Sequence, residues 1–130
     1  MNAVIRAATL SALGRGWRVF GIRDGFNGLL RADQYHPRRP GFFELKRSNV
    51  RGITHLGGTI LGTTNRYSPA HFPVTRPNGE VAYVDRCPDL VQMLHRHGVD
   101  ALIAIGGEGS MAIAQRIASN NFPVVGVPKT

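Results

Sequence analysis

The chain has 130 residues, 42% hydrophobic and 18% charged, which fits one globular domain with a real core and is too short for two. No apolar run approaches the ~20 residues of a membrane-spanning helix, and the N-terminus lacks the pattern of a signal peptide. Cys87 is the only cysteine, which excludes disulfides and cysteine-based metal sites. These features predict a cytoplasmic protein without a membrane partner.

The net charge of +8 comes almost entirely from arginine, since only two lysines are present. Nucleic-acid-binding proteins usually concentrate positive charge and interleave it with aromatic residues. Here the densest basic groups lie at residues 38–39 and 46–51, with Phe42 and Phe43 between them. A basic nucleic-acid-binding module is therefore an alternative, but we favour an arginine-rich surface that faces an anionic small molecule.

The first half of the chain predicts one helix, one strand and a loop. Residues 2–13 are rich in alanine and leucine and predict a helix with Asn2 as its N-cap. Polar and apolar residues alternate over residues 17–22, which predicts a strand. The prolines of residues 32–41 indicate an exposed loop. Residues 45–53 fit either a short helix or a strand.

A second glycine-rich segment begins the other half of the chain. Residues 57–66 predict either a short buried strand between turns or a backbone wall near a phosphate, with Arg66 reaching inward. Residues 69–79 indicate another loop. Pro88 then occupies the favoured first position of a helix, which Gly98 ends.

The last part of the chain predicts a strand at residues 99–105, a helix at residues 110–118 and a strand at residues 123–127. Strand, helix and strand in this order require a right-handed crossover. The two strands are therefore expected to lie parallel in one sheet.

The most informative feature is the glycine turn between that strand and that helix. Gly107, Glu108, Gly109 and Ser110 follow a buried-strand run directly. Such a junction directs unpaired N–H groups and the positive end of a helix dipole at one point, which suits a phosphate. Glycine permits close approach of the backbone, and Glu108 offers a carboxylate for the magnesium that phosphate brings. The alternative is a glycine turn kept for steric reasons alone.

Together these segments resemble the 6-phosphofructokinase family, specifically the first part of its nucleotide-binding domain. The matching segments, in the family's order, are residues 1–6, 25–29, 57–63, 98–110 and 125–130. The resemblance implies an α/β fold, a three-layer sandwich around a mainly parallel sheet. Residues 1–130 would be an incomplete N-terminal domain that lacks its first strand and the catalytic aspartate loop.

The resemblance also implies an activity. The family transfers the γ-phosphoryl group of ATP, or one phosphoryl group of pyrophosphate, to the 1-hydroxyl of fructose 6-phosphate in glycolysis. By this resemblance, Gly107, Gly109 and Ser110 would cradle the donor's phosphates, and Arg66 would pair with their charge. Glu108 would hold Mg²⁺, at a position where aspartate is more usual.

Two positions bear on the phosphoryl donor. Gly109 leaves room for ATP, because pyrophosphate-using relatives commonly have an aspartate there. Lysine at the position of Lys129 is frequent in pyrophosphate users, although the combination of Gly109 with Lys129 also occurs among ATP users. The resemblance therefore favours ATP. Lys129 and Thr130 would contribute to the sugar-phosphate side of the site.

No catalytic residue is assigned, because the family's aspartate base would lie beyond Thr130. We therefore expect this chain to be inactive alone, and the intact enzyme to be a homo-oligomer, a dimer or a tetramer. A lipid or dinucleotide kinase with a related Gly-Gly-Asp-Gly-Thr turn is a second alternative. Residues 57–63 and 127–130 favour the phosphofructokinase pattern over it.

Overall fold

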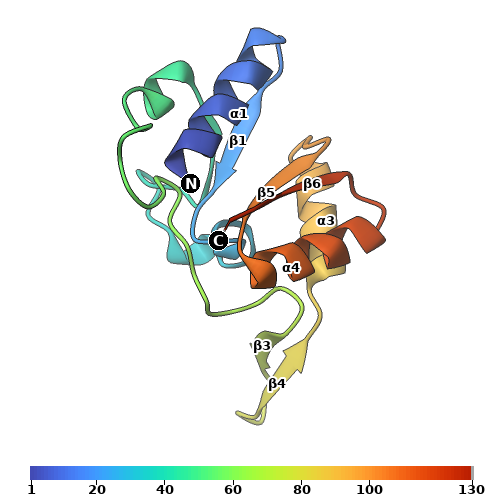
Figure 1. Ribbon diagram of the computed structural model, residues 1–130. Coiled ribbons are helices and arrows are strands. Elements are labelled where there is room, and N and C mark those ends of the chain that lie inside the picture. Colours follow the sequence, from blue (N-terminus) through green and yellow to red (C-terminus); the bar gives the residue numbers. More distant parts are fainter. Residues whose placement is uncertain (130) are drawn as a thin grey trace. The chain divides into compact units, whose positions relative to one another are not determined.

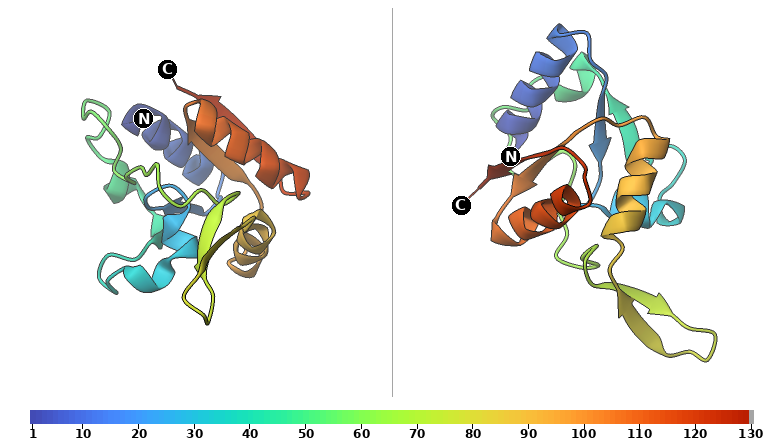
Figure 2. Two further views of the ribbon diagram at one scale, coloured as in Figure 1. Left: turned by 90° about the horizontal axis from the view of Figure 1, so that it is seen from below. Right: turned by 90° about the vertical axis from the view of Figure 1, so that its right-hand side faces the viewer.

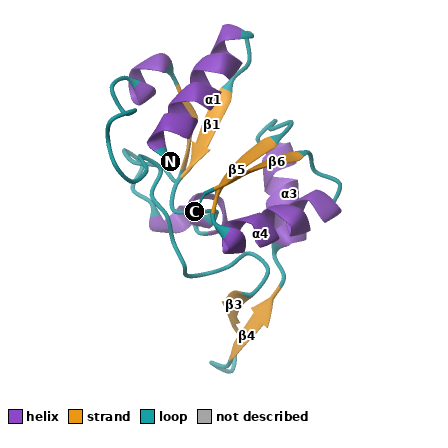
Figure 3. Ribbon diagram, in the orientation of Figure 1, coloured by secondary structure: helices purple, strands orange, loops and turns teal. Residues whose placement is uncertain are grey.

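The computed structural model describes residues 1–129, and the chain divides into two compact units. Unit 1 is Met1–Thr64, and unit 2 is Asn65–Thr130. Each unit mixes helices with short strands (Figure 3). Among the described residues, no helix is both long and apolar enough to cross a bilayer.

Unit 1 places a helix against a pair of strands. Its elements are α1 (Asn2–Gly14), β1 (Val19–Ile22), α2 (Asn27–Leu30), β2 (Phe42–Leu45) and two 3-10 helices, η1 (Ala32–Gln34) and η2 (Arg47–Val50). α1 contacts β1 and η2, and β1 pairs antiparallel with β2 (Figure 1). The predicted first helix and first strand are confirmed to within two residues. Residues 45–53 are neither one helix nor one strand, because they contain the end of β2 and then η2.

Asn2 does not cap α1 as predicted. Its side chain instead binds a distant part of unit 1. The Asn2 Nδ2 donates to the carbonyls of Leu56 and Gly57 at 3.2 and 3.3 Å, and its Oδ1 accepts the Ile60 N–H at 2.7 Å. Asn2 is 2% exposed. The glycine-rich segment that it holds forms turns rather than a buried strand, with Gly58 in the left-handed region.

Unit 2 combines a hairpin with a strand–helix–strand unit. Its elements are β3 (Phe72–Thr75), β4 (Val81–Val84), α3 (Cys87–Arg96), β5 (Leu102–Gly106), α4 (Glu108–Ser119) and β6 (Val124–Pro128). The β3–β4 hairpin projects away from the other elements of this unit (Figure 2). β3 lies inside the segment predicted as a loop. β5 and β6 pair in parallel, from Leu102↔Val124 to Gly106↔Pro128, which confirms the predicted parallel pair.

The core of unit 2 lies among its helices and the parallel strands. α4 packs against both β5 and β6 and contacts α3. The side chains of Leu90, Leu94, Ile117 and Phe122 are at most 2% exposed. The rings of Phe122 and His95 meet edge to face at 5.2 Å. This packing holds the end of β5 and the start of α4 in a defined geometry.

The described strands form three two-stranded sheets rather than one mainly parallel sheet. In the residues that the structure describes, β1–β2 and β3–β4 are antiparallel and only β5–β6 is parallel. Each strand has only four or five residues, and each strand pairs only with the strand next to it in chain order. The mixed α/β character is confirmed. The single central sheet of a three-layer sandwich is absent from residues 1–129.

Two predicted boundaries in unit 2 shift for local reasons. The Val99 N–H donates to the Leu94 carbonyl at 2.9 Å, as part of the turn that closes α3, so β5 begins only at Leu102. At the other end of β5, the backbone becomes helical immediately after Gly107. α4 therefore starts at Glu108, two residues before the predicted helix.

Asp85 joins the start of α3 to the last turn of α4. One carboxylate oxygen accepts the Cys87 N–H at 2.9 Å, and the other accepts a hydrogen bond from the Arg116 guanidinium at 2.7 Å. Arg116 first, and the Cys87 N–H second, hold the pKa of Asp85 below its ordinary value. The carboxylate form is therefore more favoured in the folded chain than in the unfolded one.

We expect this pair to contribute stability only while Asp85 is ionised. Because the folded-state pKa is depressed, its contribution is full above the unfolded pKa of about 3.9 and is lost as pH falls through the folded value. Asp85→Asn keeps an acceptor for the Cys87 N–H but removes the charge. The variant should melt below the wild type at pH 7, and the two melting temperatures should converge near pH 2. A difference that persists at pH 2 contradicts the assignment.

Candidate phosphate-binding site

The carboxyl ends of β5 and β6 lie side by side at the start of α4. Gly106 pairs with Pro128 in the parallel register, and the Lys129 N–H donates to the Gly106 carbonyl at 2.7 Å. A Cβ built on Gly107 would lie 3.8 Å from the Lys129 carbonyl oxygen. The structure therefore brings Lys129 together with the glycine turn through main-chain contacts. Ligands of open α/β sheets bind at this end of the strands.

The start of α4 presents unpaired backbone donors to solvent. Gly107 is the N-cap residue, in an extended conformation, and it has no side chain with which to cap the helix. Its carbonyl accepts the Met111 N–H at 3.0 Å. The N–H groups of Glu108, Gly109 and Ser110 lie in the first turn of α4, where no earlier helical residue offers a carbonyl acceptor. These three residues are exposed. Donors and helix dipole together favour an anion at this point.

Glycine is required at one position of the turn and leaves open space at another. A Cβ on Gly106 would overlap the Ser110 hydroxyl oxygen and lie 2.6 Å from the Ser110 Cβ. The close approach of Gly106 to Ser110 thus fixes where the first turn of α4 begins. Among the described residues, apart from its chain neighbours and the backbone of α4, no atom lies within 4 Å of a Cβ built on Gly109. The space in front of the first helical turn is therefore open at Gly109.

Glu108 is the acidic residue of the first turn of α4, and its side chain is exposed. Among the described residues, no group of three or more histidine, cysteine, aspartate or glutamate side chains forms a metal site. Magnesium bound with a nucleotide does not need such a group, because it commonly takes one or two carboxylates together with phosphate oxygens and water. Glu108, beside the exposed glycine turn, fits that donor set.

The other three predicted site residues differ in how the structure places them. Lys129 joins the turn through its main chain, and its side chain is exposed. Arg66 lies exposed on the segment that leads into β3, and its role as a phosphate partner stays a prediction. Thr130 lies outside the described residues.

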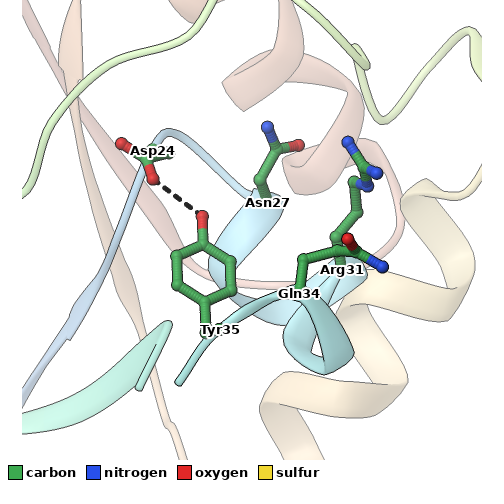
Figure 4. Close-up of a pocket in the computed structure, with 5 residues that line it drawn as sticks. All are labelled: Asp24, Asn27, Arg31, Gln34 and Tyr35. Atoms are coloured by element: carbon green, nitrogen blue, oxygen red, sulfur yellow. Dashed lines mark hydrogen bonds between the residues drawn. The ribbon is translucent and has the colours of Figure 1, made fainter. Parts of the chain in front are cut away.

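Sequence reasoning assigned no role to a cavity in unit 1. Its volume is about 250 Å³, and five polar or charged residues line it (Figure 4). One of its lining residues, Asn27, lies in the segment at residues 25–29, which contributed to the family resemblance but carried no predicted function. The lining residues are Asp24, Asn27, Arg31, Gln34 and Tyr35.

Comparison with known protein families gives a match over the whole chain. The family model for phosphofructokinase matches residues 1–130. The chain is 42% identical to ATP-dependent 6-phosphofructokinase 1 of Nostoc sp. and covers 34% of that protein. It is 38% identical to the ATP-dependent 6-phosphofructokinase of Vibrio cholerae and again covers 34%. The chain thus spans about a third of the length of the curated relatives that it matches.

Solved structures show the same fold. The chain is similar to phosphofructokinase from Saccharomyces cerevisiae, with a TM-score of 0.71 and 24% identity over 100% of this chain and 18% of that one. It is also similar to phosphofructokinase from Pichia pastoris, with a TM-score of 0.70 and 23% identity over 98% of this chain and 13% of that one. At these identities the likeness concerns the fold.

Proposed function

The chain belongs to the phosphofructokinase family, and from this premise we propose that it forms the donor-phosphate part of a 6-phosphofructokinase. The reaction is phosphoryl transfer from ATP to fructose 6-phosphate in glycolysis, within a cytoplasmic dimer or tetramer. The observation that carries the proposal is the exposed start of α4, whose N-cap residue Gly107 has no side chain, at the carboxyl ends of β5 and β6.

The turn acts by positioning and charge neutralisation, which are the main demands of phosphoryl transfer. The N–H groups of Gly109 and Ser110 donate to phosphate oxygens, and the absence of a side chain at Gly107 allows their close approach. Glu108 would hold the Mg²⁺ that accompanies the donor, and that ion would supply charge neutralisation when bound. Arg66 supplies a further positive charge. The sugar phosphate lies toward Lys129 and Thr130.

The open space at Gly109 supports ATP as the donor. An aspartate there would place a negative charge at the positive end of α4, where the nucleotide's phosphates are proposed to lie. The relatives from Nostoc and Vibrio are both described as ATP-dependent. Lys129 is compatible with this choice, because its backbone is held by Gly106 and its side chain is exposed.

Gly109→Ala separates phosphate binding from stability. Alanine is a better helix former than glycine by up to about 1 kcal/mol, and no neighbour obstructs the new methyl group. We therefore expect a melting temperature equal to or above that of the wild type. The methyl group occupies the space proposed for the phosphates, so affinity for ATP with Mg²⁺ should fall by about tenfold or more, which corresponds to ~1.4 kcal/mol. Isothermal titration calorimetry on the 130-residue chain measures it.

The matched control is Gly14→Ala, at the end of α1, where no atom lies within 4 Å of the built Cβ either. It should change stability in the same direction and leave ATP binding unchanged. Equal affinity in the wild type and Gly109→Ala contradicts the proposed site. Pyrophosphate with Mg²⁺ forms the second arm of the titration, and tighter binding of pyrophosphate than of ATP would reject ATP as the donor.

A further inference from the structure

The turn after β1 holds an aspartate in an unusual backbone conformation. Asp24 has a φ of 54°, in the left-handed region, and Gly25 follows it with a φ of 66°. Few residues other than glycine adopt that region, although aspartate tolerates it better than most. Such residues persist where the surrounding contacts require them, and they are concentrated at functional sites. The conformation of Asp24 therefore indicates a role beyond joining β1 to α2.

This turn fixes the last part of the glycine-rich segment. The Asp24 N–H donates to the Leu61 carbonyl at 2.8 Å. A Cβ built on Gly62 would overlap the Asp24 Oδ1, so the carboxylate lies directly against the Gly62 backbone. A Cβ built on Gly25 would lie 3.3 Å from the Thr64 Cγ2. This part of the chain thus lies along the Asp24–Gly25 turn.

Tyr35 holds the Asp24 carboxylate in place. Its hydroxyl donates to the Asp24 Oδ2 at 2.8 Å, and Figure 4 shows this bond. Burial first, and Asp24 second, raise the pKa of Tyr35 to about 12, so the hydroxyl keeps at neutral pH the proton that it donates. The Asn27 N–H donates to the Asp24 carbonyl at 3.2 Å. Both the side chain and the main chain of Asp24 are therefore fixed within unit 1.

Arg66 follows this anchored part of the chain almost at once. Only Asn65 separates Thr64 from Arg66, and two residues of extended chain span at most about 7 Å. Arg66 is exposed, and in the proposed function its charge pairs with the donor's phosphates. A side chain on a backbone that is already fixed contributes more to binding, because less conformational freedom is lost when the ligand binds.

We propose that Asp24 is a positioning residue, which holds Arg66 where its guanidinium pairs with the phosphates of the donor. This role rests on the proposed function, because the anion is the donor that the start of α4 binds. Asp24 acts through the chain that leads to Arg66 and does not itself contact the donor. A purely structural role would instead lower stability and leave the contribution of Arg66 to binding unchanged.

The first measurement needs no nucleotide. ¹⁵N relaxation of the 130-residue chain reports the mobility of the Arg66 amide on the ps–ns timescale. Asp24→Ala removes the carboxylate, and alanine tolerates the left-handed region poorly, so the order parameter of Arg66 should fall from about 0.85 toward about 0.6. Asp24→Asn keeps both an acceptor for the Tyr35 hydroxyl and a tolerance of positive φ, and it should give the wild-type value. An unchanged order parameter in Asp24→Ala overturns the proposal.

A double-mutant cycle then separates positioning from folding. Calorimetry below the melting temperature of every variant measures affinity for ATP with Mg²⁺. Arg66→Gln should weaken binding about tenfold and Asp24→Ala at least about threefold. In the Arg66→Gln background, Asp24→Ala should change affinity by less than about twofold, because the residue through which it acts is gone. Equal losses from Asp24→Ala in both backgrounds overturn the proposal. Tyr35→Phe removes only the hydroxyl and replaces Asp24→Ala in the cycle if that variant fails to fold.

Asp33→Ala is the matched control. Asp33 is an exposed acidic residue of η1, and its carboxylate accepts a hydrogen bond from the Gln34 side chain at 3.0 Å. The variant should bind ATP like the wild type. A wild-type chain that does not bind ATP rejects the proposed function and the role of Asp24 with it. Binding of ATP that is unchanged in Arg66→Gln rejects the role of Asp24 alone.

Discussion

Replacing Gly28 with alanine is expected to unfold most of unit 1. A Cβ at Gly28 would overlap the Gly41 carbonyl oxygen and lie 2.7 Å from the Gly41 carbonyl carbon and 2.8 Å from the Arg23 nitrogen. All three atoms belong to the backbone, so no side-chain rotation relieves the overlap. Overpacking of a well-packed region commonly costs about 1–3 kcal/mol, and the backbone contacts place this change at or above the upper end.

The hydrogen bonds around Gly28 explain why the loss extends through the unit. The Arg23 N–H donates to the Gly41 carbonyl at 2.8 Å, and the Gly28 N–H donates to the Arg23 carbonyl at 2.9 Å. Separating the two glycines breaks the first of these bonds and moves β2 away from β1. Urea unfolding and hydrogen exchange of the β1 and β2 amides measure the effect.

Gly57→Ala is the control for that experiment. Among the described residues other than its chain neighbours, no atom lies within 4 Å of the built Cβ, and the backbone at Gly57 is outside the left-handed region. The substitution should be neutral or stabilise unit 1 slightly, by less than about 1 kcal/mol, because alanine restricts the unfolded chain. If Gly28→Ala is as stable as Gly57→Ala, the close approach of Gly28 and Gly41 is wrong.

Gly106→Ala is expected to destabilise unit 2 and abolish phosphate binding together. The new methyl group would lie 2.6 Å from the Ser110 Cβ, which belongs to the first turn of α4. Rotating the Ser110 hydroxyl removes only part of the overlap, so the turn must move. We expect a loss of about 1–3 kcal/mol. Affinity for ATP with Mg²⁺ should fall below detection, because the N–H groups of the turn no longer point at one spot.

A second substitution tests this explanation directly. Ser110→Gly in the Gly106→Ala background removes both atoms that the methyl group meets. Neighbouring substitutions of this kind are strongly non-additive, so the double variant should regain much of the lost stability. Urea unfolding of the two single variants, the double variant and the wild type gives the coupling energy. Additive losses would mean that Gly106 is required for another reason.

Local patterns predicted the parts of the fold that depend on neighbouring residues. β5, α4 and β6 were predicted because a buried run, a glycine turn and an amphipathic helix follow one another within about thirty residues of chain. The parallel pairing of β5 and β6 then follows from the crossover rule, and the structure confirms it. Gly98 was predicted to end a helix, and it adopts the left-handed conformation after α3.

Contacts between distant residues account for the elements that sequence reasoning missed. Asn2 is a good N-cap by residue type, but its hydrogen bonds to Leu56, Gly57 and Ile60 use the side chain elsewhere. Residues 69–79 were predicted to be a loop, yet β3 lies within them and belongs to a two-stranded hairpin, where a proline such as Pro73 is tolerated. The pairing of β1 with β2 depends on the approach of Gly28 to Gly41, which no local pattern signals.

The same contrast between local patterns and distant contacts applies to the candidate functional residues. The turn of Gly107, Glu108, Gly109 and Ser110 was predicted from contiguous residues, and the structure places all four at the start of α4. The cavity of unit 1 was missed, because its polar lining comes from scattered positions of residues 24–35 that follow no periodic pattern. The contacts of Asp24 with the glycine-rich segment likewise become evident only once the surrounding packing is known.

The main-chain bond from Lys129 to Gly106 has a consequence for protein engineering. Since a backbone hydrogen bond holds residue 129 at the turn and its side chain is exposed, we expect that side chain to be exchangeable without loss of the turn. A side chain at residue 109 would likewise meet no obstructing atom among the described residues outside α4 itself. A combinatorial library at these two codons, grafted into a full-length relative, should therefore yield mostly folded proteins. Directed evolution toward another phosphate source thus has two positions at which to start.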